Sequence, residues 1–194
     1  MATSFSPNRL RSTIADRGGL ATTEKFEVVF SGNIIGNLGS SVAKDLQFLC
    51  ENVALPTKSI SASEKMIHGT SYQMPYRHAF QELSMTFYLT DDMAQKKFFD
   101  NWQALIVDPT TGDLKFHDNY TCNMKIKKYG HLASGFGDTP TYEIEIIKAW
   151  PSIVAEVQLS HGGGNEIARL PVTMQYKKWL PTSGNRGGTA SIDT

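Results

Sequence analysis

The stretch QELSMTFYLTDDMAQKKFFDNWQALIV, residues 81–107, contains the two patterns that decide the fold. Its first part alternates apolar and polar side chains from Leu83 to Leu89, which is the period of a strand with one buried face. Its second part predicts an amphipathic helix, because its apolar side chains recur at helical spacing. That apolar face consists of Phe98, Phe99, Trp102, Leu105 and Ile106.

The ends of this helix can also be predicted from the sequence. We expect it to span about residues 91–107, with Thr90 as its cap. Asp91 and Asp92 would then lie in the first turn, where the helix dipole favours anions. Pro109 follows the last apolar residue and should end the helix.

Most of the remaining central region has the alternating pattern of strands. The clearer strands are expected at 25–31, 45–55, 141–150 and 168–179, and weaker ones at 57–63, 66–77, 120–129 and 155–160. In the 45–55 segment, the strand period would place Leu46, Phe48 and Cys50 on one face. One helix among about eight or nine strands predicts a mainly β fold, a β-sandwich or barrel with the helix packed on it.

Composition divides the 194 residues into three parts. Residues 1–24 are rich in Ser, Thr, Arg and Gly without an apolar period, so we expect a flexible or extended arm. Residues 25–181 contain the strand and helix patterns and should form a single β domain. Residues 182–194 are rich in Gly, Ser and Thr, which is typical of a flexible tail.

The charge balance excludes some classes of protein. Lys plus Arg and Asp plus Glu are 19 each, so the formal net charge is zero. A general nucleic-acid binder needs a basic excess to displace counterions, and this chain lacks one. No apolar run approaches the length of a membrane span, so we expect no membrane anchor, and the N-terminal segment has no apolar block typical of a secretory signal.

One glycine-rich segment raises the possibility of an enzyme. His161 is followed by three glycines, as in the oxyanion-hole segment of some lipases and esterases. The G-x-S-x-G nucleophile motif of that fold is absent, and strand-like segments flank the glycines, which favours a loop. An esterase that uses His161 and a carbohydrate-binding sandwich that uses exposed Trp or Tyr remain alternatives.

Metal and phosphate sites have even weaker support. The histidines and cysteines show none of the spacings of metal-binding motifs, so no metal or cofactor is expected. Cys50 and Cys122 are predicted to be reduced, buried thiols. Lys125 and Lys127 alternate with Ile126, which favours a solvated strand face over a phosphate site.

Three stretches in order carry a family resemblance: residues 48–61, 96–106 and 149–179. Together they resemble the tail tube protein of contractile-tailed bacteriophages, a family whose fold is shared by the type VI secretion tube protein. The resemblance covers about residues 25–180. The positions that match the family are Cys50, Leu55, Pro56, Phe99, Trp102, Trp150, Pro151, Glu156, Asn165, Glu166, Tyr176 and Trp179.

This resemblance implies a structural subunit and no catalytic activity. Six copies would close into a ring with a continuous inner β-barrel, and rings would stack into a hollow tube inside a contractile sheath. The implied partners are other copies, the sheath, baseplate and tail terminator proteins, and, in the lumen, the tape measure protein and DNA without sequence-specific binding. The protein would assemble in the host cytoplasm and remain in the virion tail. A baseplate tube initiator and the tube of a secretion or injection system are the alternatives.

Overall fold

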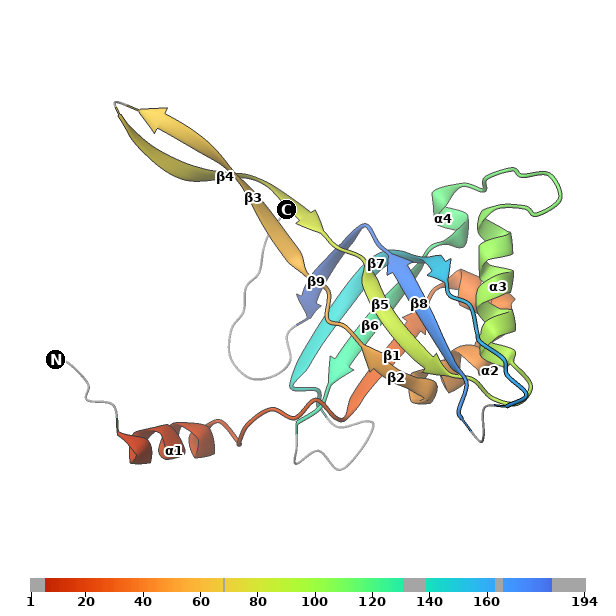
Figure 1. Ribbon diagram of the computed structural model, residues 1–194, viewed down its shortest axis with the longest axis horizontal. Coiled ribbons are helices and arrows are strands. Elements are labelled where there is room, and N and C mark those ends of the chain that lie inside the picture. Colours follow the sequence, from red (N-terminus) through yellow and green to blue (C-terminus); the bar gives the residue numbers. More distant parts are fainter. Residues whose placement is uncertain (1–5, 68, 131–138, 163–165, 183–194) are drawn as a thin grey trace.

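The computed structural model describes residues 6–67, 69–130, 139–162 and 166–182 (Figure 1). These residues form four helices: α1 (Pro7–Asp16), α2 (Asn33–Leu49), α3 (Ala94–Ile106) and α4 (His117–Tyr120). They also form nine strands: β1 (Phe26–Ser31), β2 (Cys50–Val53), β3 (Lys58–Ile67), β4 (Thr70–Phe80), β5 (Leu83–Tyr88), β6 (Cys122–Lys128), β7 (Tyr142–Val154), β8 (Arg169–Gln175) and β9 (Lys178–Thr182). The predicted mainly β fold is confirmed.

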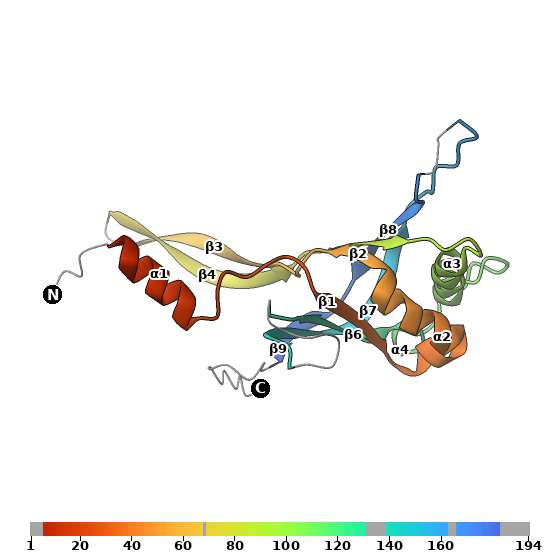
Figure 2. The ribbon, with the colours of Figure 1, turned by 90° about the horizontal axis from the view of Figure 1, so that it is seen from below.

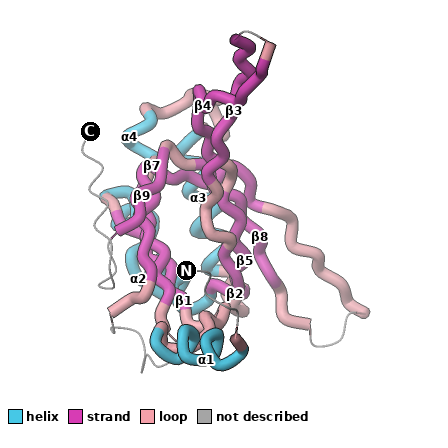
Figure 3. The backbone as a smooth tube through the Cα atoms, turned by 90° about the vertical axis from the view of Figure 1, so that its left-hand side faces the viewer, coloured by secondary structure: helices cyan, strands magenta, loops and turns pink. Residues whose placement is uncertain are grey.

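Seven strands form one antiparallel sheet in the order β1-β6-β7-β8-β5-β2, and β9 pairs with the first half of β7. Strand β7 belongs to both halves of this sheet, because its first half pairs with β6 and β9 and its second half with β8. Figure 3 shows the halves as two layers, one with β1, β7 and β9 and the other with β2, β5 and β8.

A bend in β7 makes this change of layer possible. Lys148 has a φ of 56°, the left-handed region that residues other than glycine rarely adopt. The pairing register with β6 shifts nearby, between Cys122 and Met124. The backbone N–H of Lys148 is satisfied by Asn123, whose Oδ1 accepts its hydrogen bond at 3.2 Å. An irregularity of this kind bends a strand sharply and lets it continue in a second layer.

The core lies between the two halves of the sheet and is closed at one end by α2 and α3 (Figure 2). The alternation predicted for residues 81–89 is confirmed, since Leu83, Met85 and Phe87 are all fully buried. The inward side chains of the other half belong to the same cluster: Val28, Phe30, Cys122, Met124, Ile126, Ile144 and Ile146. One shared core is what a sandwich of two half-sheets requires.

The helix predicted near residues 91–107 is confirmed as α3, with corrections at its edges. Phe98, Phe99, Trp102 and Ile106 are buried, but Leu105 is 40% exposed and does not belong to the core face. At 3.6 residues per turn, consecutive side chains point in different directions, so Leu105 and Ile106 cannot both face the core.

The predicted cap was wrong, because the helix begins later than expected. Met93, with a φ of 54°, precedes Ala94, so Thr90, Asp91 and Asp92 all lie outside the first turn. The Thr90 hydroxyl instead contacts the carboxylate of Asp92 and the side-chain oxygen of Gln95. Asp92 Oδ1 accepts a hydrogen bond from the backbone N–H of Ala94 at 3.3 Å, so this carboxylate satisfies one of the orphan donors at the start of the helix.

The strand predicted at 45–55 was also wrong over most of its length. Residues 33–49 form α2, which buries Ile34, Ile35, Ala43 and Leu46, while Phe48 is 62% exposed. A kink at Gly39, with φ of 120°, allows the two parts of α2 to follow the core. The strand is limited to β2, which starts at Cys50 and pairs with β5.

Three further expectations needed correction. Residues 155–160 form no strand; β7 instead extends through Pro151 to Val154. The segment 168–179 is divided between β8 and β9. The region predicted to be a flexible or extended arm contains helix α1. The predicted tail lies outside the described residues, apart from Thr182.

Candidate assembly surfaces and a polar pocket

The most prominent surface feature is the hairpin of β3 and β4, which projects from the body of the molecule (Figures 1 and 2). The two strands pair only with each other, from Lys58 opposite Phe80 to Ile67 opposite Thr70. On β4, every residue from Thr70 to His78 is exposed. The sequence predicted two weak strands here but did not show that they leave the domain.

This hairpin carries large apolar side chains that nothing in the described chain covers. Ile60 is 64% exposed, Met66 73% and Tyr76 68%. Tyr76 is the unpaired residue of a β-bulge, since Ser61 pairs with Arg77 and Ala62 pairs with Pro75. A bulge accommodates proline, which cannot donate to the strand ladder.

Only the base of the hairpin contacts the domain. The rings of Phe80 and Tyr176 lie 6.0 Å apart, and Ala79 and Phe80 are the only half-buried residues of β4 among those described. A two-stranded hairpin alone in water is marginally stable at best. Its exposed apolar face therefore indicates a surface that becomes covered by another molecule.

The outer face of the half-sheet with β1, β6 and β7 carries charges in alternating columns. Lys127 lies between Glu27 and Glu143 in the strand register, and its Nζ is 3.4 Å from Glu27 Oε2. Lys125 Nζ is 3.3 Å from Glu143 Oε1. Both lysines were predicted to lie on a solvated strand face, and on this face each of them lies beside a glutamate.

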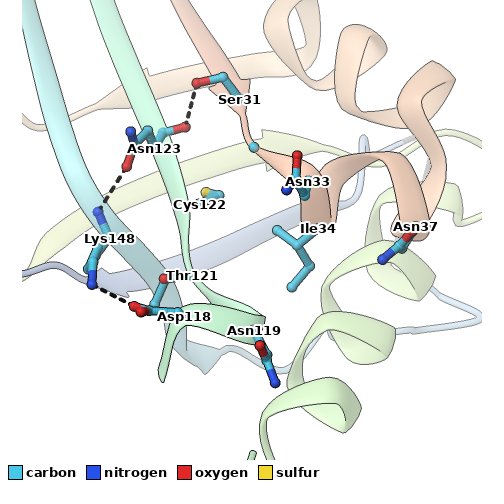
Figure 4. Close-up of a pocket in the computed structure, with 11 residues that line it drawn as sticks. Ser31, Asn33, Ile34, Asn37, Asp118, Asn119, Thr121, Cys122, Asn123 and Lys148 are labelled. Carbon is cyan, nitrogen blue, oxygen red and sulfur yellow. Dashed lines mark hydrogen bonds and ion pairs between the residues drawn. The ribbon is translucent and has the colours of Figure 1, made fainter. Parts of the chain in front are cut away.

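A polar pocket of about 630 Å³ lies where β1, α2, α4, β6 and β7 meet (Figure 4). Its charged groups neutralise each other, because Lys148 Nζ is 2.5 Å from Asp118 Oδ1. This contact holds the pKa of the Asp118 carboxyl below its usual value. Ser31 donates a hydrogen bond to the Asn123 carbonyl oxygen at 3.1 Å, so its hydroxyl is also engaged.

The pocket contains one sulfur nucleophile, and it is not activated. Burial raises the pKa of the Cys122 thiol from 9.0 to about 12, so the thiolate is scarcely populated near neutral pH. No histidine lines the pocket in the described part of the chain. Both cysteines are free, as predicted, with Cys122 buried and Cys50 half-buried.

The glycine-rich segment also lacks a catalytic arrangement in its described portion. His161 and Gly162 are exposed, and the N–H of Gly162 lies 3.3 Å from Ser160 Oγ; the next two glycines fall outside the described residues. Across the described ranges, no group of His, Cys, Asp or Glu could hold a metal ion. In the same ranges, no helix is both long and apolar enough to cross a membrane.

The family positions mark the core more than any surface site. Phe99, Trp102 and Pro151 are buried. Five others are half-buried: Cys50, Pro56, Trp150, Tyr176 and Trp179. Leu55, Glu156 and Glu166 are exposed, and Asn165 lies outside the described residues.

Two of these side chains contain buried polar atoms without a partner. Tyr176 Oη and Trp179 Nε1 form no hydrogen bond with any described residue. Burial raises the pKa of Tyr176, as expected for a hydroxyl removed from solvent. Tyr176 lies near the base of the hairpin, and Trp179 lies in the edge strand β9. The sequence identified both residues as family positions, but it contained no signal that their polar atoms are buried without a partner.

Solved structures share this fold. One chain of the PVC sheath-tube complex of an extracellular contractile injection system, in its extended state, matches with a TM-score of 0.60 and 10% identity, covering 93% of this chain and 99% of that chain. The PVC sheath/tube terminator matches with a TM-score of 0.59 and 11% identity, covering 84% and 97%. A crystal structure of Hcp protein matches with a TM-score of 0.51 and 12% identity, covering 85% and 96%.

This chain thus shares its fold with chains of an extracellular contractile injection system and with Hcp protein. The sequence itself matches the family model described as phage tail tube protein over residues 21–182, and the chain belongs to that family. No protein of curated function matches the sequence. The resemblance inferred from three short stretches is confirmed.

Proposed function

We propose that this structural protein is the main subunit of a tail tube, in which six copies form a ring and rings stack into a hollow tube. The observation that carries the proposal is the projecting β3–β4 hairpin, whose apolar side chains are exposed in the single chain. A hairpin that leaves its own domain can cover this surface only on another molecule. When the same contact repeats from copy to copy, a ring or a continuous filament results.

Free strand edges support ring closure. β1 and β2 are the two ends of the sheet order, and each pairs with only one neighbour. Exposed edges are a risk for uncontrolled pairing, and closure into a barrel removes that risk. We propose that neighbouring subunits join their sheets into a continuous inner barrel and that residues 25–181 form the domain that does so.

The paired charges of the β1–β6–β7 face suit a surface past which DNA moves. Because Lys125 and Lys127 each lie beside a glutamate, they are less available to phosphate groups than free lysines would be. A lumen with this property would let DNA slide without being held. We propose that the tube conducts DNA, with a tape measure protein in the lumen before ejection, and that it acts without catalysis.

The remaining partners follow from the place of a tube in a tail. We propose that a contractile sheath surrounds the tube, that a baseplate starts it and that a terminator ends it. Assembly would take place in the host cytoplasm, and the finished tube would remain in the virion. A baseplate tube initiator is the second candidate function, because a chain of the anti-feeding prophage baseplate has the same fold, with a TM-score of 0.58 and 12% identity.

Electron microscopy of the purified full chain, over a range of concentrations and with or without a baseplate template, tests the proposal. Hexameric rings and long tubes are expected. Single rings that never extend would favour the initiator, and strictly monomeric particles under every condition would overturn the proposal.

A matched variant tests the role of the hairpin. Replacing Ile60, Met66 and Tyr76 with serine removes exposed apolar side chains and should leave the fold intact, because these residues are outside the core. Tube formation should be lost while the circular dichroism spectrum is retained. A control with Ser63→Ala and Glu64→Gln, on the same hairpin, should still assemble.

A further inference from the structure

Helix α1 is specified by its own sequence at both ends. Pro7 occupies the first helical position, where its missing N–H costs nothing. At the other end, the N–H of Gly18 donates to the Ala15 carbonyl at 3.0 Å and that of Gly19 donates to the Ile14 carbonyl at 2.9 Å. These two bonds form a Schellman motif, which the positive φ of 80° at Gly18 permits.

Nothing in the described chain covers this helix. It buries none of its residues, and Leu10 is 51% exposed. Isolated helices shorter than about 12–15 residues are marginal in water, and α1 has 10. The sequence of α1 specifies where the helix begins and ends, but no surface of the described chain packs against it. We therefore expect a partner molecule to pack against this helix.

The exposed face of α1 has a definite chemistry. Leu10 and Ile14 lie one turn apart, so they form a short apolar stripe. Arg11 lies beside this stripe on the helix, and Arg17 is the C-cap residue that follows the last helical residue, Asp16. Within the described ranges, neither arginine takes part in an ion pair. The partner should therefore offer an apolar surface bordered by acidic groups.

Such a surface lies where α3 connects to α4. It consists of Leu105, Val107, Leu114 and Phe116, which are 40%, 41%, 74% and 84% exposed, and we call it the α3–α4 patch. Four large apolar side chains exposed on one short segment are typical of an interaction site.

The patch is held by the backbone and bordered by carboxylates. Val107 and Leu114 face each other across an isolated β-bridge. The N–H of Asp108 donates to the Asp113 carbonyl at 3.1 Å, which closes the turn beyond this bridge. Asp108 and Asp113 thus place two acidic side chains beside the apolar residues, and neither forms an ion pair with a described residue. Asp108 Oδ1 accepts hydrogen bonds from the N–H groups of Thr110 and Thr111 at 2.9 and 3.4 Å, and these bonds, with a smaller contribution from Lys115, lower the pKa of the Asp108 carboxyl. Asp113 is therefore the carboxylate that we use to test the contact.

Within one copy, α1 and the α3–α4 patch lie at opposite ends of the long axis (Figures 1 and 2). We infer that α1 of one copy docks on the α3–α4 patch of a second copy, with the apolar stripe on Leu114 and Phe116 and the arginines beside Asp108 and Asp113. This head-to-tail contact rests on the proposed tube and names the segment and the surface that join its subunits.

Disulfide trapping tests this contact in the assembled full-length protein. One chain carries Leu10→Cys and another carries Leu114→Cys, and the two are assembled together and oxidised. A covalent dimer is expected in tubes, and each single variant alone should give none. Pairing Leu10→Cys with Met66→Cys, at the hairpin, is the matched negative control. The native thiols give little background because burial raises the pKa of both to about 12.

Charge reversal provides an independent measurement. Arg11→Glu or Asp113→Arg alone should lower the yield of the trapped dimer about tenfold, since like charges at an interface cost on the order of 1.4 kcal/mol or more. The two reversals on opposite partners should restore the yield. Equal yields in all four combinations would overturn the inference.

The outcomes separate the inference from the proposed function. Tubes of the parent protein that give no trapped dimer overturn only the docking of α1. A dimer formed between Met66→Cys and Leu114→Cys instead would show that the hairpin occupies the patch, and it would also overturn the docking of α1. A parent protein that never assembles would overturn both.

Discussion

Trp102 in α3 donates a hydrogen bond from its Nε1 to the backbone carbonyl oxygen of Tyr120, at 2.7 Å, and so ties α3 to the end of α4. The indole is fully buried and stacks on Phe99, with an angle of 8° between the ring planes and 6.3 Å between their centroids. One side chain therefore fills the core and also satisfies a backbone acceptor in a connecting segment.

Truncation of this side chain should be costly. Trp102→Ala should lower the free energy of unfolding by about 3–5 kcal/mol, the usual range for a buried large aromatic. Trp102→Phe keeps most of the volume but loses the hydrogen bond to Tyr120, and it should cost about 1–3 kcal/mol. Urea denaturation of the unassembled subunit measures both, and a shift near zero for the alanine variant would contradict the packing of α3.

Deletion of residues 1–24 should impair assembly more than folding. α1 buries none of its residues, and Lys128 Nζ donates an exposed hydrogen bond to the carbonyl oxygen of Glu24, at the end of this region. The unfolding free energy should change by about 0.5 kcal/mol or less, as for other surface changes. Circular dichroism and electron microscopy give the two readouts, and a loss of β-sheet signal would contradict this prediction.

The Cys122 thiol should be unreactive in the folded protein. In a Cys50→Ser background, a thiol reagent at pH 8 should label Cys122 only after unfolding, because burial raises the pKa of this thiol to about 12. The folded state holds the thiol proton more tightly than the unfolded state. The contribution of Cys122 to the free energy of unfolding is therefore constant below pH 9 and decreases as the pH rises toward 12. Over that range, the parent should lose stability relative to Cys122→Ala; a constant difference would argue against the burial.

The bend in β7 should tolerate glycine and reject a β-branched residue. Lys148→Val and Lys148→Gly both remove the ion pair with Asp118, so their comparison isolates the backbone. Because φ is 56° at this position, valine should be less stable than glycine by about 1–3 kcal/mol. Thermal or urea unfolding measures the difference, and two variants of equal stability would show that the strand does not require this conformation.

Local patterns were sufficient wherever one side-chain period continued over a whole element. The buried face of β5 could be predicted from the alternation of Leu83, Met85 and Phe87. The buried face of α3 could be predicted from the helical spacing of Phe98, Phe99 and Trp102. The pattern failed in α2, where three glycines within residues 32–39 resemble a loop although Ile34, Ile35 and Leu46 are buried. Burial of this helix against the core outweighs its low intrinsic propensity.

The sequence by itself determined the mainly β class, the position of α3 and, through three ordered stretches, the family. The fold class, the position of α3 and the family depend on short-range side-chain periods and on residue identities, and both can be read directly from the sequence. Only the tertiary structure decided that β3 and β4 leave the domain, that β7 bends at Lys148 and that α1 and the α3–α4 patch lie at opposite ends. Such relationships depend on contacts between distant segments, and a local pattern contains no information about which of its faces remains uncovered.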